Sequence, residues 1–205
     1  MFPRRIVEVE ACINGRTLSI GAYFGADGDG LVTGLLADQL DDGDWNCWSE
    51  HGATVSSFDS TICVLDGLLE YELSGGGVAV TGACRRGEEY RLARQLCRRR
   101  MSTGEVPAGR WQQFSWPPRW HYTSFAPSTT SAAPAAPDRR VAEAVQLVRN
   151  KRQVDGTWFL ENTHPGETQL EFEDGDERPS RWNTLRALRR PQLVRRPTVT
   201  SPGRW

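Results

Sequence analysis

Apolar residues recur at helical spacing in separate stretches of the chain, and the clearest of these stretches follows Ser56. Asp59, three positions later, makes this start resemble a capping box, which predicts that a helix begins there. Its apolar stripe consists of Phe58, Ile62, Leu65 and Leu69. Because these positions recur every three or four residues, they predict one buried face of an amphipathic helix. The glycines at 75–77 predict its end.

Other stretches predict helices in the same way. They are residues 7–23, residues 31–40, residues 82–99, a stretch that follows Asp138 and bears Val141, Val145 and Val148, and a stretch that follows Ser180 and bears Trp182, Leu185 and Leu188. Asp138 and Ser180 are residue types that cap helix N-termini. Gly15 and Gly21 are unfavourable inside the first stretch. No alternating pattern persists anywhere in the chain, so the sequence predicts an all-α fold.

A turn motif occurs twice, each time after one of these helices. Residues 39–45 read QLDDGDW and residues 152–158 read RQVDGTW. The Asp-Gly pair predicts a tight reversal, because glycine accepts a positive φ and aspartate can bond its own backbone. We expect each tryptophan to pack beneath a neighbouring helix pair, and Gln39 to bond free backbone groups of a neighbour. The residues of this structural repeat are Gln39, Asp42, Gly43, Trp45, Asp155, Gly156 and Trp158. The motif thus favours a structural role over catalysis.

Composition divides the chain into one domain with two irregular parts. Residues 1–190 are long enough for a single core. Residues 102–137 interrupt it: they begin with an aromatic stretch in which Pro117-Pro118 excludes a helix, and they end in a linker-like segment at 123–137. The tail at 191–205 is predicted to be disordered because it is basic and rich in proline.

Charge and cysteine content exclude several classes of protein. The net charge is −1, so no overall field favours nucleic acid. The chain has five cysteines and no C-x-x-C, a pattern typical of a reduced cytoplasmic protein. No apolar run is long enough for a transmembrane segment. The sequence does not determine the oligomeric state.

The repeated motif resembles the Gln-Trp repeats of squalene and terpenoid cyclases, whose αα-toroid is shared with protein prenyltransferase β-subunits. Longer strings, among them LLADQLDDGDWNC, SSFDSTICVLDGLLEYE and LVRNKRQVDGTW, are similar to a group of bacterial squalene-cyclase-like proteins over roughly residues 7–190. The resemblance implies a partial αα-toroid, with fewer helix pairs than a complete one. It implies the fold and no particular reaction.

The catalytic signatures of these families are not recognisable in this chain. The Asp-x-Asp-Asp acid of the class II cyclases is missing, because Asp41-Asp42 belongs to the turn motif. There is no D-D-x-x-D for magnesium diphosphate and no clear Asp, Cys and His set for zinc. Cys47, His51 and Asp59 could make a zinc site, but their spacing is wider than zinc sites normally show. No cofactor is assigned, and neither zinc nor magnesium is excluded.

Residues 123–132 differ from the resembling group in a specific way. They read TSFAPSTTSA, where the group has a helix of the type DVLRALDYLR. A one-base shift of codons for that helix yields TSFAPSTTSA, which suggests a local frameshift that removes one inner helix. Resequencing of the gene tests this hypothesis, and a confirmed in-frame reading would end it.

Acidic and histidine side chains are the candidates for catalysis. Asp174 and Asp176 precede the last predicted helix, where carboxylates can complement the helix dipole, act as a general acid or hold a hard cation. His164 lies in the polar string ENTHPG and could be a base, a ligand or a turn residue that bonds backbone. A capping role is the simpler interpretation of these acids.

An aromatic group is the candidate for ligand binding. It consists of Trp116, Trp120, His121, Tyr122, Arg181 and Trp182. Aromatic faces can stabilise a carbocation, although rings between helices can also serve only for packing. The sequence therefore predicts a terpenoid-cyclase-like or prenyltransferase-like protein that binds a hydrophobic, isoprenoid ligand. Two alternatives stay open: a non-catalytic helical-repeat interaction module or degenerate fragment, and a carbohydrate-acting αα-toroid.

Overall fold

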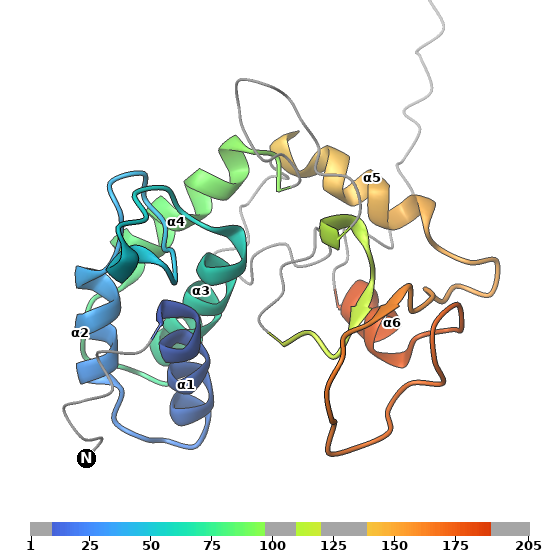
Figure 1. Cartoon of the computed structure of the whole chain (residues 1–205), viewed down its shortest axis with the longest axis horizontal. Helices are drawn as coiled ribbons and strands as arrows, with labels where there is room; N and C mark the ends of the chain where they lie inside the picture. The colour runs from blue at the N-terminus through green and yellow to red at the C-terminus, as the bar shows by residue number, and fades with distance from the viewer. Residues whose placement is uncertain (1–9, 97–109, 120–138, 190–205) are drawn as a thin grey trace, which may run out of the picture.

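The computed structural model describes residues 10–96, 110–119 and 139–189, and most of their regular structure is helical (Figure 1). The α-helices are α1 (Ala11–Tyr23), α2 (Asp29–Ala37), α3 (Phe58–Leu73), α4 (Thr81–Ala93), α5 (Ala142–Asn150) and α6 (Arg181–Leu188). Short 3₁₀ turns are η2 (Ser49–His51), η3 (Arg110–Gln112) and η4 (Arg139–Val141), and the strands are β1 (Ser115–Trp116) and β2 (Asn162–Thr163). The predicted helical class is confirmed. Trp120, His121, Tyr122, the linker 123–137, Asp138 and the tail 191–205 lie outside the described residues.

The start of α3 differs by one residue from the predicted capping box. Ser57, and not Ser56, is the N-cap, and its hydroxyl accepts a hydrogen bond from the Ser60 N–H at 3.5 Å. Ser56 is held instead by Asp42, whose carboxylate accepts from both the N–H (2.9 Å) and the hydroxyl of Ser56. Since this contact keeps Ser56 in the preceding turn, the helix begins one position later than predicted.

Two other predictions, the end of one helix and the buried face of another, differ from the structure for backbone and packing reasons. The helix predicted over 82–99 ends at Ala93, because Gln95 and Leu96 have φ values of 54° and 60°, which no helix continues. The chain turns there, and Leu96 is buried by the turn. On α6 the predicted apolar face is wrong: Leu185 and Leu188 are exposed, and the buried side chains include Ala187.

The closest helix contact joins α1 and α3 and explains why glycines occur inside both helices. A Cβ added to Gly15 would lie 2.5 Å from the carbonyl oxygen of Cys63, and one added to Gly67 would lie 2.3 Å from the carbonyl oxygen of Gly15. Only glycine permits this approach. Leu18, Val64 and Leu68 belong to the buried cluster around this crossing. The tight crossing compensates for the low intrinsic helix propensity of glycine.

The first turn motif ties α2 to the start of α3. The Trp45 side chain is 0% exposed, and its indole N–H donates to the Leu35 carbonyl of α2 at 2.7 Å. The Trp45 backbone carbonyl accepts from the Ser57 N–H at 2.8 Å, and its N–H donates to the Thr61 hydroxyl at 3.3 Å. Gly43 takes the predicted positive φ, 100°. One tryptophan thus fixes the end of one helix and the beginning of the next.

The second turn motif repeats these contacts between α5 and α6. Trp158 is also 0% exposed, and its indole N–H donates to the Val148 carbonyl at 2.7 Å. Its backbone carbonyl accepts from the Ser180 N–H at 2.7 Å, and its N–H donates to the Thr184 hydroxyl at 3.1 Å. In both copies the bonded carbonyl lies ten positions before the tryptophan, and the threonine lies four positions after the serine cap. The two motifs are therefore the same local structure.

The first residue of each motif has an equivalent contact as well. The Gln39 amide donates to the Gly43 carbonyl at 2.6 Å, as the Arg152 guanidinium does to the Gly156 carbonyl at 3.5 Å. Gln39 also donates to the Ala83 carbonyl at 3.0 Å, which is the predicted bond to a neighbouring helix, α4. The first contact closes the turn, and the second joins the turn to α4.

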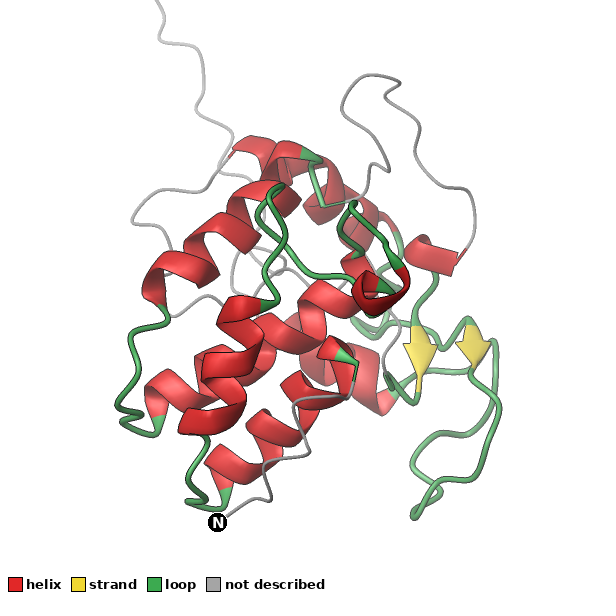
Figure 2. Ribbon diagram, turned by 60° about the vertical axis from the view of Figure 1, so that its left-hand side comes forward, coloured by secondary structure: helices red, strands yellow, loops and turns green. Residues whose placement is uncertain are grey.

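The copies differ in the length of the chain between tryptophan and serine cap. Ser57 follows Trp45 by 12 positions, whereas Ser180 follows Trp158 by 22. The longer segment forms β2 and an exposed loop, and β2 pairs in parallel with β1 (Figure 2). No alternating pattern predicted this ladder, because each strand has only two residues. The two copies therefore differ in the loop after the tryptophan, and the second copy forms a strand there.

Candidate functional site

The β1–β2 ladder gathers the candidate residues that the structure describes. Trp116 is paired with Thr163, and the His164 N–H donates to the Trp116 carbonyl at 2.8 Å. The Thr163 hydroxyl donates to Asp176 at 2.6 Å. The ladder thus links one predicted ligand-binding residue, Trp116, with two predicted catalytic residues, His164 and Asp176.

Rings from three segments form an aromatic cluster at this ladder. The Trp116 ring centroid lies 5.2 Å from that of Phe172 and 5.1 Å from that of Trp182. All three side chains are half-buried. The indole N–H of Trp182 is withdrawn from water and has no acceptor among the described residues. The structure therefore brings together Trp116 and Trp182, which the sequence assigned to ligand binding, and adds Phe172.

A cleft of about 330 Å³ opens beside this aromatic cluster. It is lined by Trp116, Pro117, Arg119, Glu167, Thr168, Gln169 and Leu170. Arg119 is positioned by its backbone, whose carbonyl accepts from Arg16 of α1 at 3.4 Å, and by its guanidinium, which donates to the Glu167 carbonyl at 3.1 Å. Gly166 permits this arrangement, because its φ is 108° and a Cβ there would lie 2.8 Å from Nη2 of Arg119. The cleft has apolar residues in its wall, together with one basic and one acidic residue, Arg119 and Glu167.

The acidic residues before α6 are engaged in local contacts. Asp174 forms an ion pair with Arg181 at 2.9 Å, and both side chains are more than half exposed. Ser180 is the N-cap of α6, and Glu173 adds a second set of contacts there by accepting from the N–H groups of Arg181 and Trp182 at 3.1 and 2.8 Å. Sequence reasoning chose Asp174 and Asp176 and missed Glu173, because only the path of the loop decides which carboxylate faces the helix N-terminus.

His164 is a buried side chain beside the ladder. Its Nδ1 lies 3.3 Å from the amide nitrogen of Asn162. Because its own N–H bonds the backbone of β1, the position of His164 is fixed by the sheet.

The segment that carries Trp116 is anchored by the only lysine of the chain. Lys151 donates to Glu161 at 2.6 Å and to the Gln112 carbonyl at 2.8 Å, and its ammonium lies 4.8 Å from the Phe114 ring centre. Glu161 also accepts from the Phe114 N–H at 2.8 Å. This partly buried network joins α5, β1 and the start of β2, so it holds the aromatic cluster in place.

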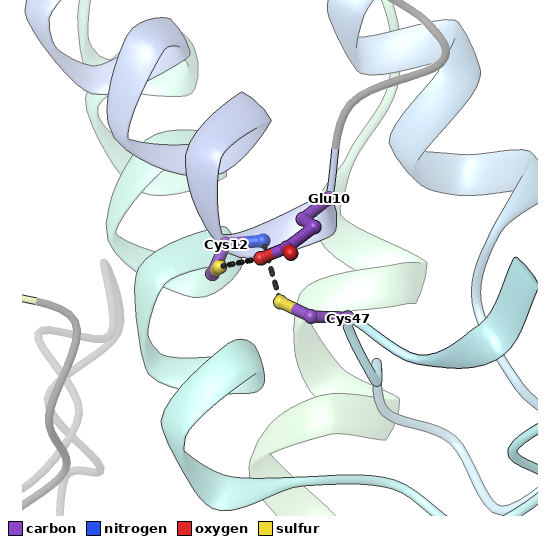
Figure 3. Close-up of side chains that lie close together, drawn as sticks. All are labelled: Glu10, Cys12 and Cys47. Carbon is purple, nitrogen blue, oxygen red and sulfur yellow. Dashed lines mark hydrogen bonds between the residues drawn. The ribbon is translucent and has the colours of Figure 1, made fainter. Parts of the chain in front are cut away.

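A second group of reactive side chains lies at the start of α1 (Figure 3). The ligand atoms of Glu10, Cys12 and Cys47 lie within 4.8 Å of one another. The Cys47 sulfur accepts from the Cys12 N–H at 3.3 Å and from the Ser60 hydroxyl at 3.0 Å. Hydrogen bonds from the Cys12 thiol and from Ser60 lower the pKa of Cys47 to about 7, against desolvation. The same contact with Cys47, together with burial, raises the pKa of Cys12.

This group replaces the zinc set considered from the sequence. Cys47 is shared, but His51 packs against the Trp48 ring at 5.4 Å, and neither His51 nor Asp59 belongs to the group. The signal that could have revealed it is weak, because Glu10 and Cys12 are 35 or more positions from Cys47. Only the fold of α1 against the first motif brings them together.

Asp44 of the first motif is a buried carboxylate. It is 0% exposed, and its oxygens accept no hydrogen bond from the described residues. Desolvation raises its pKa well above the usual range, and the charge of Arg91 only partly opposes this. Gly87 of α4 lies against it, since a Cβ there would be 2.7 Å from its Oδ1. Asp44 is therefore enclosed by packing.

No protein-family model, curated protein or solved structure matches this chain. Within the described ranges, no helix combines the length and the apolar character needed to cross a bilayer.

Proposed function

We propose that this chain is a helical-repeat protein of the terpenoid-cyclase and prenyltransferase type, and that it binds an apolar isoprenoid ligand in the cleft beside Trp116. The observation that carries the proposal is the Trp116 ring, which lines a cleft of about 330 Å³ and packs against Phe172 and Trp182. Pockets for small molecules are concave, mostly apolar and of about this volume or larger. The two equivalent tryptophan motifs support the repeat architecture.

The lining suits a ligand with an apolar chain and an anionic end. Leu170 is 74% exposed and lies in the cleft wall, where a ligand would cover it. Trp116 offers a ring face on the same wall, and Arg119 supplies a positive charge. A prenyl diphosphate has this combination, whereas squalene has only the apolar part. We therefore expect prenyl diphosphates to bind more tightly than squalene.

Binding without turnover is the activity favoured here. A carboxylic acid that protonates an alkene has to be withdrawn from water so that it stays protonated. Asp174 and Asp176 are exposed, and each already accepts a hydrogen bond from a neighbouring side chain. Their arrangement stabilises the loop before α6 and supplies no buried acid.

A thermal-shift titration tests the proposal. Farnesyl diphosphate should raise Tm of the wild type in proportion to ligand concentration, and Leu170→Glu should reduce the shift because it places a charge in the wall. Leu73→Glu is the matched control, since Leu73 is 67% exposed on α3 and does not line the cleft. An equal shift in both variants, or none in the wild type, would refute the proposed binding.

A second candidate function is an interaction module, and exposed apolar side chains favour it. Ile13 and Ile20 of α1 lie two turns apart on one helix face and are both exposed, as are Leu185 and Leu188 of α6. A neighbouring helix would cover such faces in a longer array. Sedimentation of the wild type and of Ile20→Glu over a range of concentrations tests self-association through α1.

A further inference from the structure

The ligand atoms of Glu10, Cys12 and Cys47 are spaced almost as a zinc ion requires. Their ligand atoms lie within 4.8 Å of one another, and the Cys12 sulfur is 3.6 Å from a Glu10 oxygen. Zinc binds sulfur at about 2.3 Å and carboxylate oxygen at about 2.0–2.2 Å, so tetrahedral ligands lie roughly 3.3–3.8 Å apart. One pair already has this separation, and the others need to close by about 1 Å at most.

Helix α1 and contacts with Ser60 position the ligands. Glu10 is the N-cap of α1, and Cys12 lies in its first turn. Cys47 follows Trp45 by two positions, and its N–H donates to the Ser60 hydroxyl at 3.0 Å. The same hydroxyl donates to the Cys47 sulfur, so Ser60 orients this ligand as outer partners do in metal sites. The site is therefore fixed by α1, by α3 and by the first motif.

The group is open to solvent on one side, and its ligand types select the metal. Cys12 is buried, Cys47 is half-buried and Glu10 is exposed, so the group has one side in the protein and one side open to solvent. A metal could enter from the open side, and water could complete its coordination. Two thiolates favour zinc over magnesium or calcium, which prefer oxygen ligands.

We propose that Glu10, Cys12 and Cys47 bind Zn²⁺ through one carboxylate oxygen and two thiolate sulfurs, with a water molecule in the fourth position. Binding forms the two zinc–sulfur bonds and releases to solvent the protons held by the two thiols. The metal would join the start of α1 to the chain after Trp45. In the second motif Leu160 stands where Cys47 stands in the first, so this site belongs to the first motif alone.

Titration of the reduced, metal-free protein with Co²⁺ tests the proposal. The wild type should bind one equivalent and develop a thiolate-to-cobalt charge-transfer band with a tetrahedral visible spectrum. Cys47→Ser should lose the band or bind cobalt at least about tenfold more weakly. Glu10→Gln should keep both thiolates but bind cobalt more weakly than the wild type. Cys84→Ser is the matched control, because Cys84 is a half-buried thiol of α4 outside the group.

Stability gives a second readout that does not depend on the cobalt spectrum. Zinc at about 100-fold the wild-type Kd should raise Tm of the wild type and of Cys84→Ser by about 5–10 °C, and should raise Tm of Cys47→Ser by at most about half as much. Far-UV circular dichroism shows whether each variant is folded. The proposal is overturned if Cys47→Ser and Glu10→Gln bind like the wild type, if cobalt is octahedral without the band, or if the wild type binds no metal. The result does not depend on whether the Trp116 cleft binds an isoprenoid.

Discussion

Replacing Trp45 by phenylalanine removes an indole N–H and part of a ring from a site with no exposure to solvent. The Leu35 carbonyl then loses a donor at 2.7 Å near the end of α2, where carbonyls have no helical partner. An unsatisfied buried carbonyl costs about 1–3 kcal/mol, and the cavity left by the smaller ring adds to this. We expect a loss of about 2–4 kcal/mol in the free energy of unfolding, a large share of the roughly 5–15 kcal/mol of a typical domain.

The same substitution at Trp158 should have a similar but somewhat smaller effect, because the Val148 carbonyl keeps the Lys151 N–H as a donor at 3.3 Å. Trp158 is equally buried and makes the same 2.7 Å bond to a helix carbonyl. Its backbone carbonyl likewise accepts from the N–H of the serine that caps the next helix. Trp48→Phe is the matched control, because Trp48 is 66% exposed, and it should change stability by no more than about 0.5 kcal/mol.

Urea denaturation followed by far-UV circular dichroism measures these differences as shifts of the midpoint at constant slope. The reasoning is refuted if Trp45→Phe is as stable as Trp48→Phe. It is also refuted if the free energies of unfolding of Trp45→Phe and Trp158→Phe differ by more than about 2 kcal/mol, because the two tryptophans have similar burial and contacts.

Three further predictions concern packing, pH and the anchor of the aromatic cluster. Gly67→Ala should destabilise the protein by more than about 3 kcal/mol in urea, because its Cβ would lie 2.3 Å from a carbonyl oxygen of α1, whereas Gly30→Ala has open space and should not destabilise. Because burial raises the folded-state pKa of Asp44, the folded protein binds more protons than the unfolded one, so stability should fall as pH rises from about 4 through the folded pKa. Asp44→Asn should flatten this dependence, and an unchanged profile would contradict the assignment. Lys151→Met leaves Glu161 without its cation and should destabilise the protein by about 1–3 kcal/mol while lowering ligand-induced shifts of Tm; a variant that keeps both values would show that the network is dispensable.

The sequence predicts the motifs well because their requirements are local. A positive φ at Gly43 and a serine cap at Ser180 each depend on a few neighbouring residues, and both are confirmed. The predicted contact of Gln39 with a neighbouring helix is present, but the accepting Ala83 carbonyl lies in the first turn of α4 and is not one of the free carbonyls at a helix C-terminus.

The parts that the sequence did not predict depend on contacts between distant segments. Gly15 looked unfavourable in a helix until its approach to α3 was known. The β1–β2 ladder has no periodic signal, because two residues in each strand cannot show alternation. The metal-binding group joins residues 35 positions apart, and α6 exposes leucines that its spacing placed in the core. In each case the neighbour, and not the local pattern, decides the outcome.

The binding of an isoprenoid beside Trp116 is tested most directly by the indole N–H signals of the ¹⁵N-labelled protein during titration with farnesyl diphosphate. We predict that the signals of Trp116 and Trp182 shift with saturation, while those of Trp45 and Trp158 stay in place and exchange slowly with deuterium, because both are buried and bonded. Indole signals of Trp116 and Trp182 that do not move at saturating ligand would contradict the account.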